Sequence, residues 1–298
     1  MPPALPRGAL LTDPRSASCA HPGRVAPGQT VAGGAIPGQR AVLPRGWTAL
    51  RDDPRGARLF FDFDGTLAAI AADPARVRPV AGAIAALTRL NELVGRVAIV
   101  SARPVRFLHD QFGGLVDLYG LYGLESFRDG RRHTHPEAER WRPVIADVAA
   151  RAAEMMPPAQ VEAKGLSVAL HYRTTPGLAD RITSWGRGRA NELGLRCQPG
   201  RMVMELKPPI AYDKGDVVRA ALGDASAAWF CGDDVADLRA FQALDERSAA
   251  DPSFAALRVA VANPETGAEL TDAADLTVSS PPALISLLDD LAADLRRR

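Results

Sequence analysis

Two short apolar runs set the pattern of the first half of the chain. Residues 58–61 lead into the acids of 62–64, and residues 96–101 form a second apolar run that ends in a serine. Between them, residues 80–92 carry apolar positions at helical spacing. A strand, a helix and a second strand in this order predict a pair of parallel strands joined by a helix.

The same alternation of helix and strand returns late in the chain. Helical spacing covers residues 214–222 and about 237–244, and apolar runs occupy residues 227–231 and 259–262. Both ends of the chain are therefore expected to build one α/β domain with a doubly wound parallel sheet.

The middle of the chain has a different rhythm. Its patterns are helical near residues 137–155 and 178–193 and strand-like at residues 166–172 and 201–206. We predict that residues 126–209 form an inserted α+β cap domain, with the core domain made of residues 57–125 and 210–298. Because doubly wound sheets bind ligands at the carboxyl ends of their strands, the cap is expected to cover that edge.

The first 56 residues differ in composition from the rest. They are rich in Pro, Gly, Ala and Arg, with few aromatic and almost no acidic residues. Such a segment buries too little apolar surface to offset the entropy lost on ordering. Residues 1–56 are expected to be a disordered leader or an over-long translated start. On that view, removing residues 1 to about 50 leaves activity and the melting temperature nearly unchanged.

Composition excludes several classes of protein. Of the 298 residues, 47% are apolar and 24% charged, with a formal net charge of +1, as in globular proteins that bind neither nucleic acid nor membrane through global charge. The arginines of the leader are scattered without interleaved aromatic residues, which argues against nucleic acid as a partner. No run reaches the roughly 18 apolar residues of a membrane helix, and no signal peptide is evident. The cysteines, Cys19, Cys197 and Cys231, lack metal-ligand spacing and favour a reduced cytoplasm.

Paired acids follow the first apolar strand. Asp62 and Asp64 precede Gly65, which permits a tight turn, and Thr66, which is expected to cap a helix or loop. One carboxylate can attack phosphorus while the other protonates the leaving oxygen and later activates water. Asp-x-Asp-Gly also occurs in calcium loops, but the closing Glu and the flanking helices of such a loop are missing here.

Two more elements place chemistry at a strand end and a helix start. Ser101, Ala102 and Arg103 lead into a helix whose N-terminus could hold a phosphate. Lys214 opens a helix and can neutralise phosphoryl oxygens. Taken singly, a strand-end serine is also a common cap, and a lysine is commonly solvated surface.

Acids return at a later strand end, in Gly232-Asp233-Asp234. Carboxylates gathered at the same edge as Asp62 repel one another unless a hard cation lies among them. Mg²⁺ suits this need because it accepts a few oxygen ligands and bridges to a phosphate.

Asp62-Phe-Asp-Gly-Thr-Leu67 resembles the first motif of the haloacid dehalogenase superfamily, and Ser101, Lys214 and residues 232–237 follow in the order of its other motifs. The resemblance implies a magnesium-dependent phosphatase with Asp62 as nucleophile, Asp64 as acid and base, and Lys214 as the basic residue. For Mg²⁺ it implies the side chains of Asp62 and Asp233 and the backbone carbonyl of Asp64, with Asp234 or Asp237 as a ligand or a supporting residue.

The insert resembles that of trehalose-6-phosphate phosphatases in residues 119–125, 161–173 and 200–208, and the whole resemblance spans about residues 57–290. It implies a phosphosugar substrate, trehalose 6-phosphate, and functional pairing with a trehalose-6-phosphate synthase. The residues expected to contact the substrate are Arg103, Glu162, Lys164, Arg173 and Glu205. The alternative for charges on alternating strands is a solvated face.

The chain departs from the family pattern at a few positions. Ala102 stands where the family usually has Gly, Tyr122 where it has His, and Ala236 and Leu238 where it has Thr and Glu. Leu238 removes an acid where the family commonly has a further metal ligand or supporting bond. Two other functions remain open: a related phosphosugar or glycosyl-glycerate phosphatase, and a non-catalytic phosphosugar-binding subunit. The second is expected to lose a motif residue, and all are present.

Overall fold

The computed structural model describes residues 43–297 apart from residues 72, 158, 201 and 265. Its larger sheet has eight strands in the order β12-β11-β10-β1-β2-β3-β4-β5. Pairing is parallel from β12 to β3 and antiparallel for β4 and β5. The strands are β1 (Ala57–Phe61), β2 (Arg96–Val100), β3 (Asp117–Gly120), β4 (Glu125–Arg128), β5 (Arg131–Thr134), β10 (Ala227–Gly232), β11 (Ala255–Val261) and β12 (Leu276–Val278). The predicted doubly wound sheet is confirmed.

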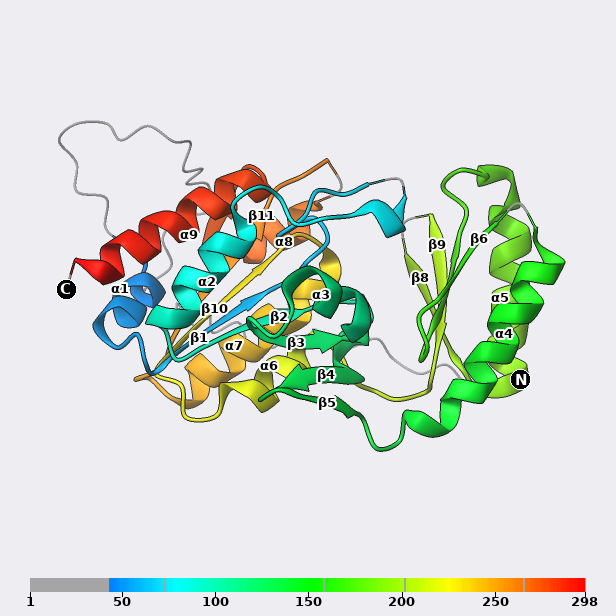
Figure 1. Cartoon of the computed structure of the whole chain (residues 1–298), viewed down its shortest axis with the longest axis horizontal. Helices are drawn as coiled ribbons and strands as arrows, with labels where there is room; N and C mark the ends of the chain where they lie inside the picture. The colour runs from blue at the N-terminus through cyan, green and yellow to red at the C-terminus, as the bar shows by residue number, and fades with distance from the viewer. Residues whose placement is uncertain (1–42, 72, 158, 201, 265, 298) are drawn as a thin grey trace, which may run out of the picture.

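Helices cover both faces of this sheet, as Figure 1 shows. One face packs against α1 (Arg45–Asp52), α2 (Ala83–Leu93), α3 (Val105–Phe112) and α9 (Pro281–Arg296). The other packs against α6 (Lys214–Leu222), α7 (Leu238–Ala250) and α8 (Ala268–Ala273). With both faces covered, the central strands β1 and β10 are buried and apolar except at Arg58, which explains the apolar runs in the sequence.

The predicted insert forms a second sheet that is covered on one face by two helices. Its sheet has the order β6-β7-β9-β8 and is antiparallel throughout, with strands β6 (Gln160–Ala163), β7 (Val168–His171), β8 (Arg196–Gly200) and β9 (Val203–Lys207). Helices α4 (Arg142–Met155) and α5 (Ala179–Leu193) pack on alternate strand residues such as Leu170 and Leu206. The helices lie on the outer side of the sheet, so the opposite face, which carries Glu162 and Glu205 in register with Ala169, looks towards the core (Figure 1).

Short 3₁₀ turns connect these elements. They are η1 (Pro74–Arg76), η2 (Leu121–Gly123), η3 (Glu139–Trp141), η4 (Pro176–Leu178) and η5 (Val235–Asp237).

The prediction of a disordered leader over residues 1–56 is wrong for its last part, residues 43–56. Residues 1–42 lie outside the described residues, but α1 follows directly and packs into the core, with Trp47 7% and Leu50 0% exposed. The Trp47 ring lies 5.2 Å from that of Trp229, whose indole N–H donates to the Gly46 carbonyl at 3.1 Å. Average composition hid this helix because two apolar residues one turn apart are enough to bury its inner face.

The expected start of the cap is also too early. Residues 126–134 belong to β4 and β5, which extend the core sheet rather than the cap sheet. They form a hairpin around Asp129 and Gly130, which both have positive φ, at 51° and 72°. Asp-Gly is a strong signal for such a turn, and it escaped notice because this stretch lacks the apolar alternation of a buried strand.

Candidate active site

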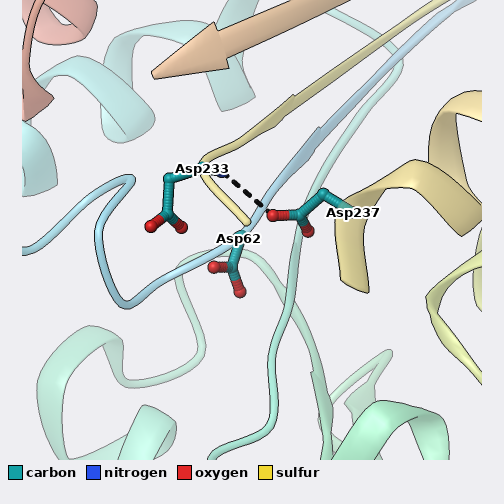
Figure 2. A group of neighbouring side chains, drawn as sticks. All are labelled: Asp62, Asp233 and Asp237. Carbon is teal, nitrogen blue, oxygen red and sulfur yellow. Dashed lines mark hydrogen bonds between the residues drawn. The ribbon is translucent and has the colours of Figure 1, made fainter. Parts of the chain in front are cut away.

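The catalytic candidates gather where the two central strands end. The backbone N–H of Asp62 donates to the Cys231 carbonyl at 2.9 Å, so the residues after β1 and β10 emerge side by side. Of the described residues, Asp62, Asp233 and Asp237 place carboxylate oxygens within 4.8 Å of one another, and all three are buried (Figure 2). The predicted meeting of these strand ends is therefore correct.

Lys214 lies inside this acidic group. Its ammonium is 2.8 Å from Asp62 Oδ1 and 2.6 Å from Asp237 Oδ1, and its side chain is 3% exposed. Asp213 and Asp216 form a capping box that fixes the start of α6 and hence Lys214. Burial lowers the pKa of Lys214, but the two carboxylates outweigh it and the pKa rises well above its usual range. Lys214 is therefore a fixed positive charge against the proposed nucleophile.

Asp237 holds both Lys214 and the loop that carries Asp233. Its second oxygen accepts hydrogen bonds from the backbone N–H groups of Asp233 and Asp234, at 3.0 and 3.1 Å. A Cβ at Gly232 would collide with the Asp237 carboxylate, so glycine is required at that position. Of the two roles left open for Asp237, its contacts favour the supporting one.

Asp233 is positioned by neutral donors. Asn263 Nδ2 donates to one oxygen at 2.7 Å and Thr66 Oγ1 to the other at 3.3 Å. The side chain of Thr66 thus acts on Asp233, and the expectation that it caps a helix or loop is not met. Burial and the charges of Asp237 and Asp234 raise the pKa of Asp233 to about 7.

The donor set fits a small divalent cation. Burial, only partly opposed by Lys214, raises the pKa of Asp62 well above its usual range, and the charges of Asp237 and Asp233 add to the rise, because the ionised carboxylates would carry more negative charge than one ammonium balances. A hard cation bound by oxygens of Asp62 and Asp233 would relieve that excess. Asp234 is exposed, and its carboxylate accepts the Ala236 N–H at 2.8 Å instead of joining the group.

Asp64 points to a different partner. Arg103 Nε and Nη2 donate to its two oxygens at 2.7 and 2.6 Å, and Arg103 Nη1 donates to the Pro74 carbonyl at 2.9 Å. The Ser101 hydroxyl accepts the Arg103 N–H at 3.1 Å, and Ala102 lies half-buried between them. Arg103, expected to bind substrate, has its guanidinium engaged by Asp64 and Pro74.

The polar face of the cap sheet brings together four of the predicted substrate contacts. Lys164 Nζ lies 3.3 Å from Glu205 Oε1, which also accepts the Ser167 hydroxyl at 2.7 Å. Glu162 is 2.9 Å from His171 Nε2 and 3.9 Å from Arg103 Nη1. Arg173 lies at the end of this face and helps to line a cavity of about 160 Å³ together with His171.

Sequence reasoning missed several participants. Ser167, just before β7, shares the face of Glu205 with Ala169 and His171 of β7, and Asn263 follows β11 beside β10. The alternation and strand-end rules would have found all of them.

Tyr122 was noted only as a departure, yet it spans core and cap. Lys207 Nζ lies 4.5 Å from its ring centre and Gln198 Nε2 donates to its hydroxyl at 3.4 Å. Its φ of 58° follows a φ of 51° at Leu121. Backbone hydrogen bonds to Ser101 and Arg103 hold this left-handed pair, a strained geometry typical of functional sites.

Comparison with known proteins adds evidence on the family of this chain. The sequence matches the trehalose-phosphatase family over residues 60–274. A trehalose-phosphate phosphatase of Mycolicibacterium paratuberculosis is 36% identical over 203 residues, covering 64% of this chain and 52% of that protein. One of Mycobacterium ulcerans is 34% identical over 255 residues, covering 81% and 63%. The chain thus spans between half and two thirds of the length of these curated relatives.

A solved structure, described as a trehalose-6-phosphate phosphatase related protein, has the same fold. It superposes with a TM-score of 0.67 at 23% identity and covers 81% of this chain and all of that one. No helix among the described residues is long and apolar enough to cross a membrane. The match over most of the chain, together with the motif residues found at one sheet edge, shows that the chain belongs to the trehalose-phosphatase family.

Proposed function

We propose that this chain is a Mg²⁺-dependent phosphatase that hydrolyses trehalose 6-phosphate to trehalose and phosphate through an aspartyl phosphate on Asp62. The observation that carries the proposal is the buried Asp62 carboxylate 2.8 Å from Lys214, beside Asp233 and beneath the polar face of the cap sheet. The names of the mycobacterial relatives support the same substrate.

In the first step, an oxygen of Asp62 forms a bond to phosphorus and the bond from phosphorus to the sugar oxygen breaks. Asp64 gives a proton to that oxygen, and Lys214 offsets the negative charge of the phosphoryl group. Bound Mg²⁺, held by Asp62, Asp233 and the Asp64 carbonyl, would supply the positive charge that draws electrons from the phosphoryl oxygens.

In the second step, water attacks phosphorus, the bond from phosphorus to Asp62 breaks, and Asp64 takes the proton of the water. The Ser101 hydroxyl and the Ala102 N–H, which precede α3 at Val105, offer hydrogen-bond donors to the phosphate oxygens. Asp62 returns as a free carboxylate, and phosphate leaves.

The cap chemistry supports a sugar as the leaving group. Lys164, Ser167 and Glu205 form a partly buried cluster of donors and acceptors that suits the many hydroxyls of a disaccharide. A sugar that lacks matching hydroxyls would leave such groups unpaired, at a cost of about 1–3 kcal/mol each. The predicted pairing with a synthase and the predicted cytoplasmic location remain predictions.

The test is phosphate release from trehalose 6-phosphate beside glucose 6-phosphate, with Mg²⁺ and with excess chelator. We expect a clear preference for trehalose 6-phosphate, loss of activity in chelator and recovery on adding Mg²⁺. Ca²⁺ should replace Mg²⁺ poorly because its looser coordination misplaces the reacting groups. Full activity in chelator would show that the reaction does not need Mg²⁺. A preference for glucose 6-phosphate would show that trehalose 6-phosphate is not the substrate.

A further inference from the structure

Arg103 occupies a position that its expected role does not explain. Its side chain is 8% exposed and reaches the proposed acid and base, the η1 turn and the cap. The guanidinium also lies 4.6 Å from the ring centre of Phe107. With these contacts the guanidinium is fixed on the core side of the site.

The contact with Asp64 is the strongest of these. Two parallel N–H groups donate to the two carboxylate oxygens at 2.7 and 2.6 Å. A bidentate pair fixes both the position and the tilt of a carboxylate, which a single contact does not. A group that must take a proton from an attacking water depends on such placement.

The cap completes the arrangement. Glu162 Oε1 lies 3.9 Å from Arg103 Nη1, and Glu162 Oε2 is 2.9 Å from His171 Nε2 on the adjacent strand. Burial raises the pKa of Glu162, but the hydrogen bond with His171 and the charges of Lys164 and Arg103 outweigh it, so the pKa is lowered and the group is a carboxylate. A chain of polar contacts thus runs from cap strands β7 and β6 to Asp64.

We propose that Arg103 is a positioning residue that orients Asp64 for the hydrolysis of the phosphorylated Asp62, and that Glu162 of the cap steadies Arg103 in this role. The step is the attack of water on phosphorus with loss of one proton to Asp64 and cleavage of the bond between phosphorus and Asp62. The inference rests on the proposed function, because it needs an aspartyl phosphate. It places Arg103 outside the set of sugar contacts.

The experiment compares two substrates that share the second step. Arg103→Lys keeps the positive charge but loses the parallel donors. Turnover of trehalose 6-phosphate and of p-nitrophenyl phosphate is measured together with the fraction of labelled phosphoenzyme at steady state. For trehalose 6-phosphate the fall in kcat should be at least as large as for p-nitrophenyl phosphate, because its leaving oxygen also needs the proton of Asp64. With p-nitrophenyl phosphate, whose leaving group needs no such proton, kcat should fall about 100-fold through slower hydrolysis of phosphorylated Asp62. The phosphoenzyme should accumulate.

A matched control and a second variant guard the interpretation. Arg106→Lys changes an exposed arginine of helix α3, which begins two residues after Arg103, and should leave the wild-type values unchanged. Glu162→Gln removes the charge that faces Arg103 and should give the same signature at a smaller, few-fold size. In the double variant, the effects of Arg103→Lys and Glu162→Gln should be less than multiplicative, because they act through one contact.

Each of the other possible outcomes contradicts one part of the proposal. A rise in KM for trehalose 6-phosphate alone would make Arg103 a sugar contact, and a fall in kcat without phosphoenzyme would make its role merely structural. Fully multiplicative effects would break the link to the cap. If the wild type hydrolyses p-nitrophenyl phosphate but not trehalose 6-phosphate, the proposed substrate is wrong, while phosphoenzyme in Arg103→Lys still decides the role of Arg103.

Discussion

At the scale of single residues, three buried acids at the sheet edge lie around one ammonium group. Asp62, Asp233 and Asp237 surround the one ammonium of Lys214, and burial raises the pKa of each acid. For Asp233, with a pKa of about 7, the metal-free folded chain binds more protons than the unfolded chain between about pH 4 and pH 7. The contribution of Asp233 to stability therefore falls as the pH rises through that window.

The first prediction concerns Mg²⁺ and pH. Since a cation at Asp233 must displace a proton at low pH, Mg²⁺ should raise the melting temperature more at about pH 8 than at about pH 5.5. Scanning calorimetry with and without Mg²⁺ measures this difference. Asp233→Asn should raise the melting temperature of the metal-free protein at about pH 8 and abolish most of the response to Mg²⁺. An equal shift at both pH values would count against Asp233 as a ligand.

Among the elements, α1 is the one that composition concealed. Its Trp47 packs against Trp229 of β10, and its indole N–H donates to Asp294 of α9 at 3.1 Å. The helix thus joins the central sheet to the C-terminal helix. The expectation that residues 1–50 can be removed without loss of stability is not compatible with these contacts.

We accordingly predict that Trp47→Ala lowers the free energy of unfolding by about 3 kcal/mol, the cost of deleting a buried aromatic side chain. Leu43→Ala is the matched control, because Leu43 precedes α1 and is 41% exposed, and it should change stability by less than about 0.5 kcal/mol. Denaturant unfolding measures both. A Trp47→Ala variant as stable as the control would mean that α1 does not contribute to the core.

For the molecule as a whole, the sequence was sufficient to predict which polar residues lie at strand ends. Asp62, Ser101 and Asp233 each follow a buried parallel strand, and strand pairing brings them to one edge. Local pattern is sufficient there, because an apolar run and the polar residue after it fix both the element and the exposed end. The same holds for the α6 start at Lys214, which its capping box marks.

Contacts between side chains that are far apart in the sequence could not be predicted. The pairs of Arg103 with Asp64 and of Glu162 with His171 depend on rotamers and on how the cap lies on the core. The left-handed backbone at Tyr122 depends on hydrogen bonds to Ser101 and Arg103, since nothing local favours it in tyrosine. Such features arise from tertiary contacts and have no periodic signature.

The most direct test of the central claim separates Asp62 from Asp64. Asp62→Asn replaces the attacking carboxylate with a neutral amide and should abolish phosphoenzyme formation, although Lys214 and the cap remain to bind substrate. Asp64→Asn keeps the nucleophile but loses the proton carrier, at a cost of about 100- to 10,000-fold in rate. With a substrate that has a good leaving group, it should form phosphoenzyme slowly and hydrolyse it slowly.

Rapid-quench labelling with phosphate-labelled substrate measures both variants beside the wild type. The account predicts an acid-stable, hydroxylamine-sensitive label in the wild type, a slowly formed and persistent label in Asp64→Asn, and none in Asp62→Asn. Label on Asp62→Asn at the wild-type level would contradict the assignment of Asp62 as the nucleophile.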